Sequence, residues 1–328
     1  MMALQVTDTL IKQAVVLDLK ATDRNDLSLK SFESMALDWL FVDQATDAEV
    51  AGLIKNKQIV VTNKVRLNRQ LLEAAPDLKL ICISATGTNN VDLTAAREQG
   101  IDVCNVTAYA TASVVQYVFT VLLSLLSRVP EYQQAVNEGG WSRSELFCLL
   151  DFPFHELQGK KLGIVGYGEL GQAVAKVAKA FGMKIVIAAR NADDQRENRV
   201  PLQDMLPQID VLSLHCPLTE STRHLISDSE INLLPKGAIL INSARGGVVD
   251  ESALLRAIDS GHLGGAATDV LTTEPPPVTH PLLQKRYNNL IVTPHVAWAS
   301  IESRQRLIDQ VAFNIEEYLA GRPRNIVN

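Results

Sequence analysis

Three side chains suited to acid–base chemistry occur in the last half of the sequence, each just after a run that reads as a strand. Arg245 lies in NSARGG, Glu274 in TTEPP and His295 in TPHVAW. An arginine can bind a carboxylate and polarise a carbonyl, a histidine can donate a proton, and an adjacent acid keeps that histidine charged. The trio therefore fits the reduction of a ketone. Taken singly, each has an ordinary alternative: Arg245 could form a helix-cap salt bridge, Glu274 could be an exposed turn residue, and His295 could be a core histidine with satisfied hydrogen bonds.

A glycine-rich turn precedes this trio. The sequence LGIVGYGELG, residues 162–171, reads as a buried strand that runs into GxGxxG and then into a helix to Phe181. The first glycine, Gly166, permits a tight turn, Gly168 lets the backbone approach a pyrophosphate, and Gly171 lets the helix pack on the strand. The helix N-terminus then faces the phosphate charge. The pattern predicts a dinucleotide site, with a merely structural glycine turn as the alternative.

The end of the next strand bears on which dinucleotide binds. An NAD enzyme usually has an acid there for the ribose 2′-hydroxyl, but the chain has Ala189 followed by Arg190. A guanidinium matches a 2′-phosphate in charge and geometry, which favours NADP and leaves NAD as the alternative. A solvated surface arginine is the other interpretation, and Asp193 and Asp194 nearby weaken the positive field.

These motifs need elements that position them. Short β-branched runs alternate with helix-length segments, which is typical of parallel βαβ units, so the chain is predicted to be α/β. Ligands of such sheets bind beyond the carboxyl ends of the strands, where we expect Arg245, Glu274 and His295 to converge. The expected strands are 14–17, 39–42, 59–62, 80–84 and 102–105 in the first third, then 162–166, 184–189, 211–215, 238–242, 266–270 and 290–293.

Three helices are expected on specific signals. Thr46 and Glu49 form a capping-box start for a helix through Ile54. A long apolar pattern runs over 110–129, followed by a polar loop, and a last helix over 301–319 would return to the first domain and make it discontinuous. Six strands after residue 160 suit a complete dinucleotide fold.

Length and composition limit the class of protein. The chain has 328 residues, enough for two domains, with 47% hydrophobic and 21% charged residues. A formal charge of −6 argues against nucleic acid or an anionic membrane as the main partner and favours small molecules.

Location and metal binding follow from simple patterns. The start, MMALQVTDTLIKQ, shows no secretory signal, and the longest apolar stretch, 118–126, is too short for a membrane span, so a cytoplasmic protein is expected. The four cysteines form no CxxC pair. This disfavours a disulfide framework and a cysteine zinc site, and no metal is expected.

From the HCPLT segment at 215–219 through ARGG, TEPP and TPHVAW, the chain resembles the D-isomer-specific 2-hydroxyacid dehydrogenases. The resemblance covers essentially the full length and is strongest over 166–298. It implies that Arg245 is the substrate arginine, His295 the proton donor and Glu274 the acid partner of that histidine. It also implies a homodimer.

The resemblance extends to domains and binding residues. It implies a Rossmann dinucleotide domain, 107–298, and a smaller flavodoxin-like substrate domain made of 1–106 and 299–328. Within ATGTNNVD, Thr86, Gly87 and Thr88 match the loop whose backbone amides hold the substrate carboxylate. The residues that match cofactor positions are the three glycines, Glu169, Leu170, Cys216, Pro217, Ser243, Ala244 and Asp269. The chain departs from the family pattern at Ala189 and Arg190, which replace the acid of the NAD type.

Within the family the chain looks most like the glycerate dehydrogenases, also called hydroxypyruvate reductases. The supporting details are Trp298 after the histidine, Gln116 on the long helix and the segment 141–157. This likeness implies hydroxypyruvate or glyoxylate as substrate. Two alternatives stay open: a dinucleotide-sensing protein like the family's corepressors, and an enzyme with another substrate. The formate-oxidising branch of the family is disfavoured, because its members resemble one another in having Gln where this chain has Glu274.

Overall fold

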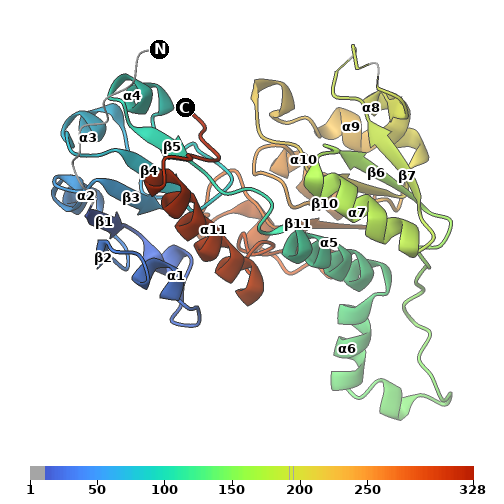
Figure 1. The fold of residues 1–328 in the computed structure, drawn as a ribbon. Helices are drawn as coiled ribbons and strands as arrows, with labels where there is room; N and C mark the ends of the chain where they lie inside the picture. Colours follow the sequence, from blue (N-terminus) through green and yellow to red (C-terminus); the bar gives the residue numbers. More distant parts are fainter. Residues whose placement is uncertain (1–11, 192, 195) are drawn as a thin grey trace. The chain divides into compact units, whose positions relative to one another are not determined.

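The computed structural model describes residues 12–191, 193–194 and 196–328. Most of the amino-terminal segment inspected for a secretion signal therefore lies outside the described residues. The chain divides into two compact units (Figure 1). One consists of the chain up to Ala110 together with Ala299–Asn328, and the other of Thr111–Trp298.

The first unit is built on five parallel strands in the order β2-β1-β3-β4-β5. This is the flavodoxin-like order 2-1-3-4-5. Burial on both faces explains the apolar runs, because every residue of β3 and β4 is buried. The strands are β1 (Gln13–Val16), β2 (Asp38–Phe41), β3 (Ile59–Thr62), β4 (Leu80–Ile83) and β5 (Asp102–Cys104).

Three of the helices of this unit, α2, α3 and α4, begin at side-chain caps that the sequence contains. The predicted capping box of Thr46 and Glu49 starts α2, while Asn68 and Asp92 cap α3 and α4 by accepting backbone N–H groups. The helices are α1 (Lys30–Glu33), α2 (Asp47–Ile54), α3 (Arg69–Glu73), α4 (Leu93–Glu98) and α11 (Ile301–Leu319).

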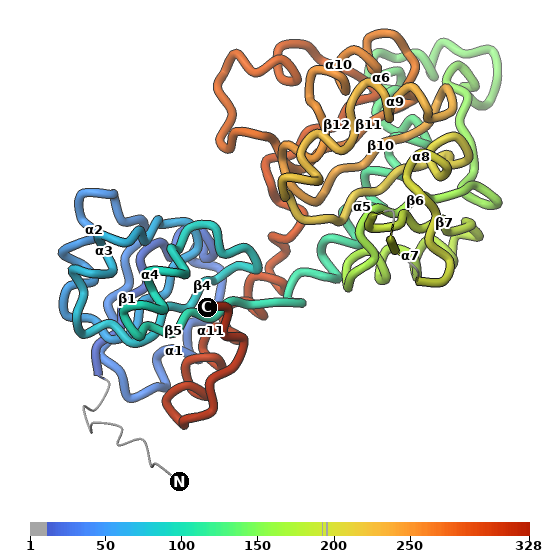
Figure 2. Tube along the Cα trace, turned by 90° about the horizontal axis from the view of Figure 1, so that it is seen from above, coloured from blue at the N-terminus to red at the C-terminus, as the bar shows by residue number. Residues whose placement is uncertain are grey.

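The last helix, α11, belongs to the first unit although it comes from the far end of the chain. It packs against β4 and α1, and Arg304 binds Asp26 through two hydrogen bonds of 2.6–2.7 Å. The segment after it lies along β5, where Ile326 bridges Cys104 and the Val327 amide donates to Val103 (Figure 2). Residues 299–328 therefore cover one face and one edge of this sheet.

The second unit has seven parallel strands in the order β12-β11-β10-β9-β6-β7-β8. The direction in which successive strands are added to the sheet reverses between β6 and β9, with β7 and β8 on one side and β10 to β12 on the other, which is the topological switch of a doubly wound Rossmann sheet. The α/β fold class is confirmed, but the two-residue strand β8 escaped the sequence analysis because it is too short to show a pattern. The strands are β6 (Lys161–Val165), β7 (Lys184–Ala188), β8 (Arg199–Val200), β9 (Val211–Leu214), β10 (Ile239–Asn242), β11 (Gly265–Thr268) and β12 (Leu290–Val292).

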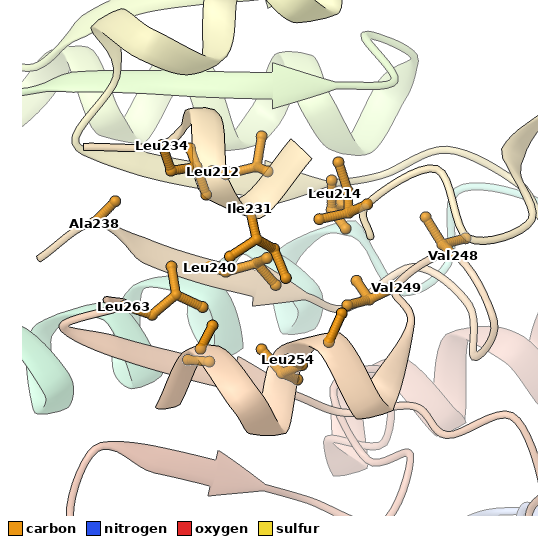
Figure 3. Packing of buried hydrophobic residues seen from close by; sticks show 14 of the residues in the cluster. Leu212, Leu214, Ile231, Leu234, Ala238, Leu240, Val248, Val249, Leu254 and Leu263 are labelled. Atoms are coloured by element: carbon orange, nitrogen blue, oxygen red, sulfur yellow. The ribbon is translucent and has the colours of Figure 1, made fainter. Parts of the chain in front are cut away.

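Helices cover both faces of this sheet. On one face, α5 (Thr111–Leu126) packs on β10 and β11, and α7 (Glu169–Ala180) packs on β6 and β7. The two helices also contact each other. On the other face, Ile231 of α9 (Asp228–Leu233) and Leu254 of α10 (Glu251–Asp259) pack on Leu212 and Leu240 (Figure 3). The short helix α8 (Leu202–Met205) contacts β7.

One helix prediction needs correction. The apolar pattern over 110–129 predicts one helix, but α5 ends at Leu126, and Arg128 takes a left-handed conformation with φ 55°. A second helix, α6 (Val129–Asn137), follows at a bend of 59° in what was expected to be partly loop. Pro130 near the start of α6 favours a new helix there.

No single helix among the described residues is long and apolar enough to cross a bilayer. Only the bent pair of α5 and α6 meets the length and composition criteria together.

Candidate active site

Each of the three predicted catalytic residues follows one of three neighbouring strands of the second unit. Arg245 comes after β10, Glu274 after β11 and His295 after β12, and these strands pair in parallel. The carboxyl ends of parallel neighbours lie at the same edge of the sheet.

The structure brings Glu274 and His295 into direct contact. Nδ1 of His295 lies 2.6 Å from Oε2 of Glu274, and both side chains are about one-third exposed. The other carboxylate oxygen, Oε1, accepts the Leu271 amide at 2.8 Å. The carboxylate is thus oriented by the backbone while it binds the imidazole, which leaves Nε2 as the nitrogen that can face a ligand.

Arg245 is exposed, and its loop packs on the loop of Glu274. Its Nη1 donates to the Ala244 carbonyl at 2.7 Å, and Asn242 holds the Arg245 carbonyl at 3.1 Å. A Cβ on Gly246 would lie only 1.9 Å from the Leu271 oxygen, so the two loops touch backbone to backbone. The loops that carry Arg245 and Glu274 meet, but the guanidinium's contact in this structure is with its own backbone.

A buried carboxylate shapes the turn that carries His295. His295 has a left-handed φ of 55°, unusual for a residue with a side chain. Asp269 Oδ1 accepts the Thr293 hydroxyl at 2.6 Å and the Val296 amide at 2.8 Å, and Oδ2 accepts the Ala297 amide at 2.8 Å. The Asp269 carbonyl accepts the His295 amide. Burial raises the pKa of Asp269 despite these donors.

Helix α5 supports the same turn from outside. The Tyr117 hydroxyl lies 2.8 Å from Thr293 Oγ1, and the Ser113 hydroxyl donates to the Ala297 carbonyl at 2.7 Å. Thr293 already donates to Asp269, so Tyr117 is the donor in its pair with Thr293. Burial raises the pKa of Tyr117 to about 12.

The glycine turn has the geometry that its sequence predicts. Gly166 has φ 90°, and a Cβ there would lie 2.6 Å from the His215 carbonyl carbon. A Cβ on Gly171 would lie 2.2 Å from the Gly166 oxygen. Gly168, in contrast, caps α7 and faces open space. The first and third glycines are therefore fixed by packing, and the second leaves room for a ligand.

The first residues of α7 differ in exposure. Glu169 is exposed and bonds to the Thr111 hydroxyl at the start of α5, whereas Leu170 is half-buried. Across the switch point, Cys216 is buried, which raises the pKa of its thiol, and the Pro217 carbonyl accepts the Thr222 hydroxyl.

Two buried polar atoms beside this edge have no hydrogen-bond partner among the described residues: Ser243 Oγ after β10 and His215 Nδ1 after β9. The opposite nitrogen of His215 bonds Ser213 at 2.8 Å. A buried polar atom without a partner is costly, so a polar ligand at this edge would satisfy it. The open Gly168, the helix N-terminus and these two atoms fit a dinucleotide.

Arg190 is exposed and follows β7, and its backbone amide donates to Asp194 at 2.8 Å. Asp194 in turn binds Arg196 through two hydrogen bonds of 2.6–2.7 Å, which holds the pKa of this carboxyl well below its usual range. The charge of Asp194 is therefore offset by Arg196, and Asp194 contacts Arg190 through the backbone amide of Arg190.

The predicted substrate loop belongs to the first unit. The Thr86 hydroxyl donates to the Val106 carbonyl, the Asn105 side chain donates to the Thr86 carbonyl, and the Thr88 carbonyl accepts the Val91 amide. Thr86 is exposed, and Gly87 and Thr88 are half-buried. The loop is held by its own unit at the carboxyl end of β4.

Comparison with known proteins identifies the family. The profile of the D-isomer specific 2-hydroxyacid dehydrogenase NAD binding domain matches residues 119–297, more than half of the chain. The chain belongs to the D-isomer-specific 2-hydroxyacid dehydrogenases. The predicted resemblance is confirmed, and the protein is an NAD(P)-dependent oxidoreductase of this family.

Several relatives are similar over most of their length. A glycerate dehydrogenase of Methylorubrum extorquens is 43% identical over 86% of this chain and 89% of its own. A hydroxypyruvate reductase of Blautia hydrogenotrophica is 40% identical over 96% and 99%. The crystal structure of the NADPH-dependent glyoxylate/hydroxypyruvate reductase of Sinorhizobium meliloti, in complex with NADP and malonate, has a TM-score of 0.79 at 27% identity, covering 96% of both chains.

Sequence reasoning missed some residues that this dehydrogenase uses to build the site. Tyr117 and Thr293 support the His295 turn, yet neither was singled out. The available signal was a tyrosine in the otherwise apolar pattern of α5, because a buried phenol normally has a hydrogen-bond partner. The resemblance places Asp269 along the cofactor, and in the structure its carboxylate binds the turn that carries His295.

His215 predicts a pH dependence of stability. Burial lowers its pKa from 6.5 to about 4, so the unfolded chain takes up a proton below pH 6.5 that the folded chain resists. The unfolding free energy should therefore fall as the pH drops from 6.5 to 4, by up to about 3 kcal/mol from this group.

Urea unfolding at pH 7.5 and 4.5, with His215→Asn as the comparison, measures this. The stability advantage of the unsubstituted protein should shrink at the lower pH. An advantage that is equal at both pH values would contradict the prediction.

Proposed function

We propose that this dehydrogenase reduces hydroxypyruvate and glyoxylate to D-glycerate and glycolate. The observation that carries the proposal is the Glu274–His295 contact of 2.6 Å at the carboxyl edge of a dinucleotide-type sheet. The similarity to a glycerate dehydrogenase and a hydroxypyruvate reductase supports the choice of substrate.

In this proposal each residue has a defined role. His295 donates a proton from Nε2 to the ketone oxygen, while Glu274 stabilises the charged imidazole through Nδ1. Arg245 turns from its backbone contact to bind the carboxylate and polarise the ketone. Backbone amides at Thr86–Thr88 hold the same carboxylate. The bound nicotinamide supplies the hydride.

The two units take different roles in this proposal. Residues 107–298 bind the dinucleotide, with the pyrophosphate at Gly168, Glu169 and Leu170 and the nicotinamide half near Cys216, Pro217, Ser243, Ala244 and Asp269. Residues 1–106 and 299–328 bind the substrate.

NADPH is the proposed cofactor, with NADH as the alternative. Arg190 is exposed just after β7, where the adenosine ribose of a bound dinucleotide lies in this fold. Because Arg196 offsets Asp194, the positive charge of Arg190 is available to a 2′-phosphate.

We also propose a cytoplasmic homodimer. Large apolar side chains are exposed on α6 and the segment after it, which extends away from the seven-stranded sheet (Figure 1). A second copy would cover them, and the mass in solution tests this. The exposed apolar residues are Val129, Val136, Trp141, Leu146, Phe147, Leu150 and Phe154.

The proposed cytoplasmic location rests on the cysteines. All four are free thiols, which accords with a reducing compartment.

Removing the acid partner should change the pH profile of reduction. In Glu274→Gln the imidazole loses the carboxylate that favours its protonated form, so the rate of reduction should fall off at a lower pH. His295→Ala should lose most turnover and keep cofactor binding. Steady-state rates from pH 5 to 9, with the exposed Glu220→Gln as control, measure this, and an unchanged profile in Glu274→Gln would remove Glu274 from the role.

A panel of keto acids tests the substrate. Values of kcat/KM with hydroxypyruvate and glyoxylate should exceed those with pyruvate and bulkier 2-keto acids. A preference for a large apolar keto acid would overturn the substrate proposal alone. The absence of turnover with every acid and both cofactors would favour a corepressor-like binding protein.

Arg190→Ala should raise KM for NADPH far more than for NADH. Loss of a charge-assisted contact to the 2′-phosphate predicts about a ten- to hundredfold effect, with kcat little changed because the contact is remote from the hydride. Arg286→Ala, another exposed arginine of the same unit, is the matched control. Equal losses with both cofactors would show that Arg190 does not select NADPH.

A further inference from the structure

Within the loop that carries Glu274, the structure describes one backbone hydrogen bond, from the His280 amide to the Pro277 carbonyl. The loop runs without regular secondary structure from the end of β11 at Thr268 to Pro281. Pro275, Pro276 and Pro277 follow Glu274 directly, and none of them has an N–H to donate. The position of the Glu274 carboxylate therefore depends on what anchors the loop on either side of these prolines.

One carboxylate binds this loop on both sides. Glu251 Oε1 accepts the Thr272 amide at 2.6 Å and the Thr272 hydroxyl at 2.9 Å. Its other oxygen, Oε2, lies 3.0 Å from Nε2 of His280. Thr272 precedes Glu274 by two residues, and His280 closes the loop six residues after it. A carboxylate only accepts, so Nε2 of His280 is the donor.

The anchor itself comes from a rigid element. Glu251 is the first residue of α10, whose N-cap, Asp250, accepts the Ser252 and Ala253 amides. The helix packs into the core through Leu254 and Ile258. The His280 side chain is only 8% exposed, so the contact lies largely out of water, where a charge-assisted bond is stronger.

We propose that Glu251 is a positioning residue for the reaction, acting through Glu274, an inference that rests on the role of Glu274 proposed above. Glu251 binds the loop at Thr272 and His280. The loop then presents the Glu274 carboxylate to the Leu271 amide and to His295 Nδ1. Glu251 touches neither substrate nor cofactor in this scheme, and its effect passes through one side chain only.

The test is a double-mutant cycle between Glu251→Ala and Glu274→Gln, measured as kcat with saturating hydroxypyruvate and NADPH. Glu251→Ala should lower kcat about ten- to a hundredfold, because a misplaced catalytic group costs this much even when the change is remote. KM for NADPH should change less than about twofold. In the Glu274→Gln background the Glu251→Ala substitution should have no further effect.

Matched variants separate positioning from folding. Glu251→Gln keeps the size of the side chain and loses one of its two anchors, so it should show a smaller loss of kcat, as should Thr272→Val. Glu230→Gln alters another glutamate at the start of a helix, α9, which binds Ser227 of its own cap and should leave kcat unchanged. Thermal unfolding of each variant confirms the fold, and Glu251→Gln replaces Glu251→Ala in the cycle if the alanine variant does not fold.

The outcomes distinguish the two proposals. Wild-type kcat in both Glu251 variants, beside a large loss in Glu274→Gln, would overturn the positioning role alone. An equal loss in the wild-type and Glu274→Gln backgrounds would also overturn it, because Glu251 would then act by another route. Wild-type kcat in Glu274→Gln would overturn the role of Glu274 and the inference with it.

Discussion

The geometry of the site depends on one buried carboxylate, Asp269. His295 adopts a left-handed conformation that costs roughly 1–3 kcal/mol unless its surroundings enforce it. The carboxylate and carbonyl of Asp269 together accept donors from Thr293, His295, Val296 and Ala297. The residue lies directly after β11, between the strands that precede Arg245 and His295. The direction of the imidazole, and hence its contact with Glu274, follows from this constraint.

Acidic side chains solve the same problem elsewhere at this edge. Loops after parallel strands have few backbone partners of their own, so their polar groups need acceptors from neighbouring elements. Asp269 serves the loop after β12, and Glu251 serves the loop after β11. In the first unit, Asp18 accepts the Asn63 and Lys64 amides after β3. In each case the carboxylate comes from another segment of the chain and binds an irregular one. Glu251 is the first residue of α10, whereas Asp269 and Asp18 lie just past the ends of β11 and β1.

Much of this was predictable from the sequence, for identifiable reasons. Short β-branched and apolar runs located all strands except β8, and the glycine spacing at 166, 168 and 171 predicted the turn geometry. The contact of Glu274 with His295 followed from their places after neighbouring strands. The break after Leu126 did not, because the apolar pattern continues across it to Val129. Contacts such as Glu251 with His280, or Tyr117 with Thr293, join residues far apart in sequence, and no local pattern reports them.

The discontinuous first unit has a consequence for the order of folding. Thr111–Trp298 is one continuous stretch, so its sheet and both helical layers can assemble as soon as that stretch has left the ribosome. The five-stranded sheet is synthesised earlier but stays incomplete, since α11 buries Leu307, Ile308, Val311 and Ile315 only after residue 300 has been made. Its final closure joins segments separated by the whole second unit, a contact of high sequence separation and therefore slow. The unit that begins first is thus the one that finishes last, and its apolar face needs protection during that interval.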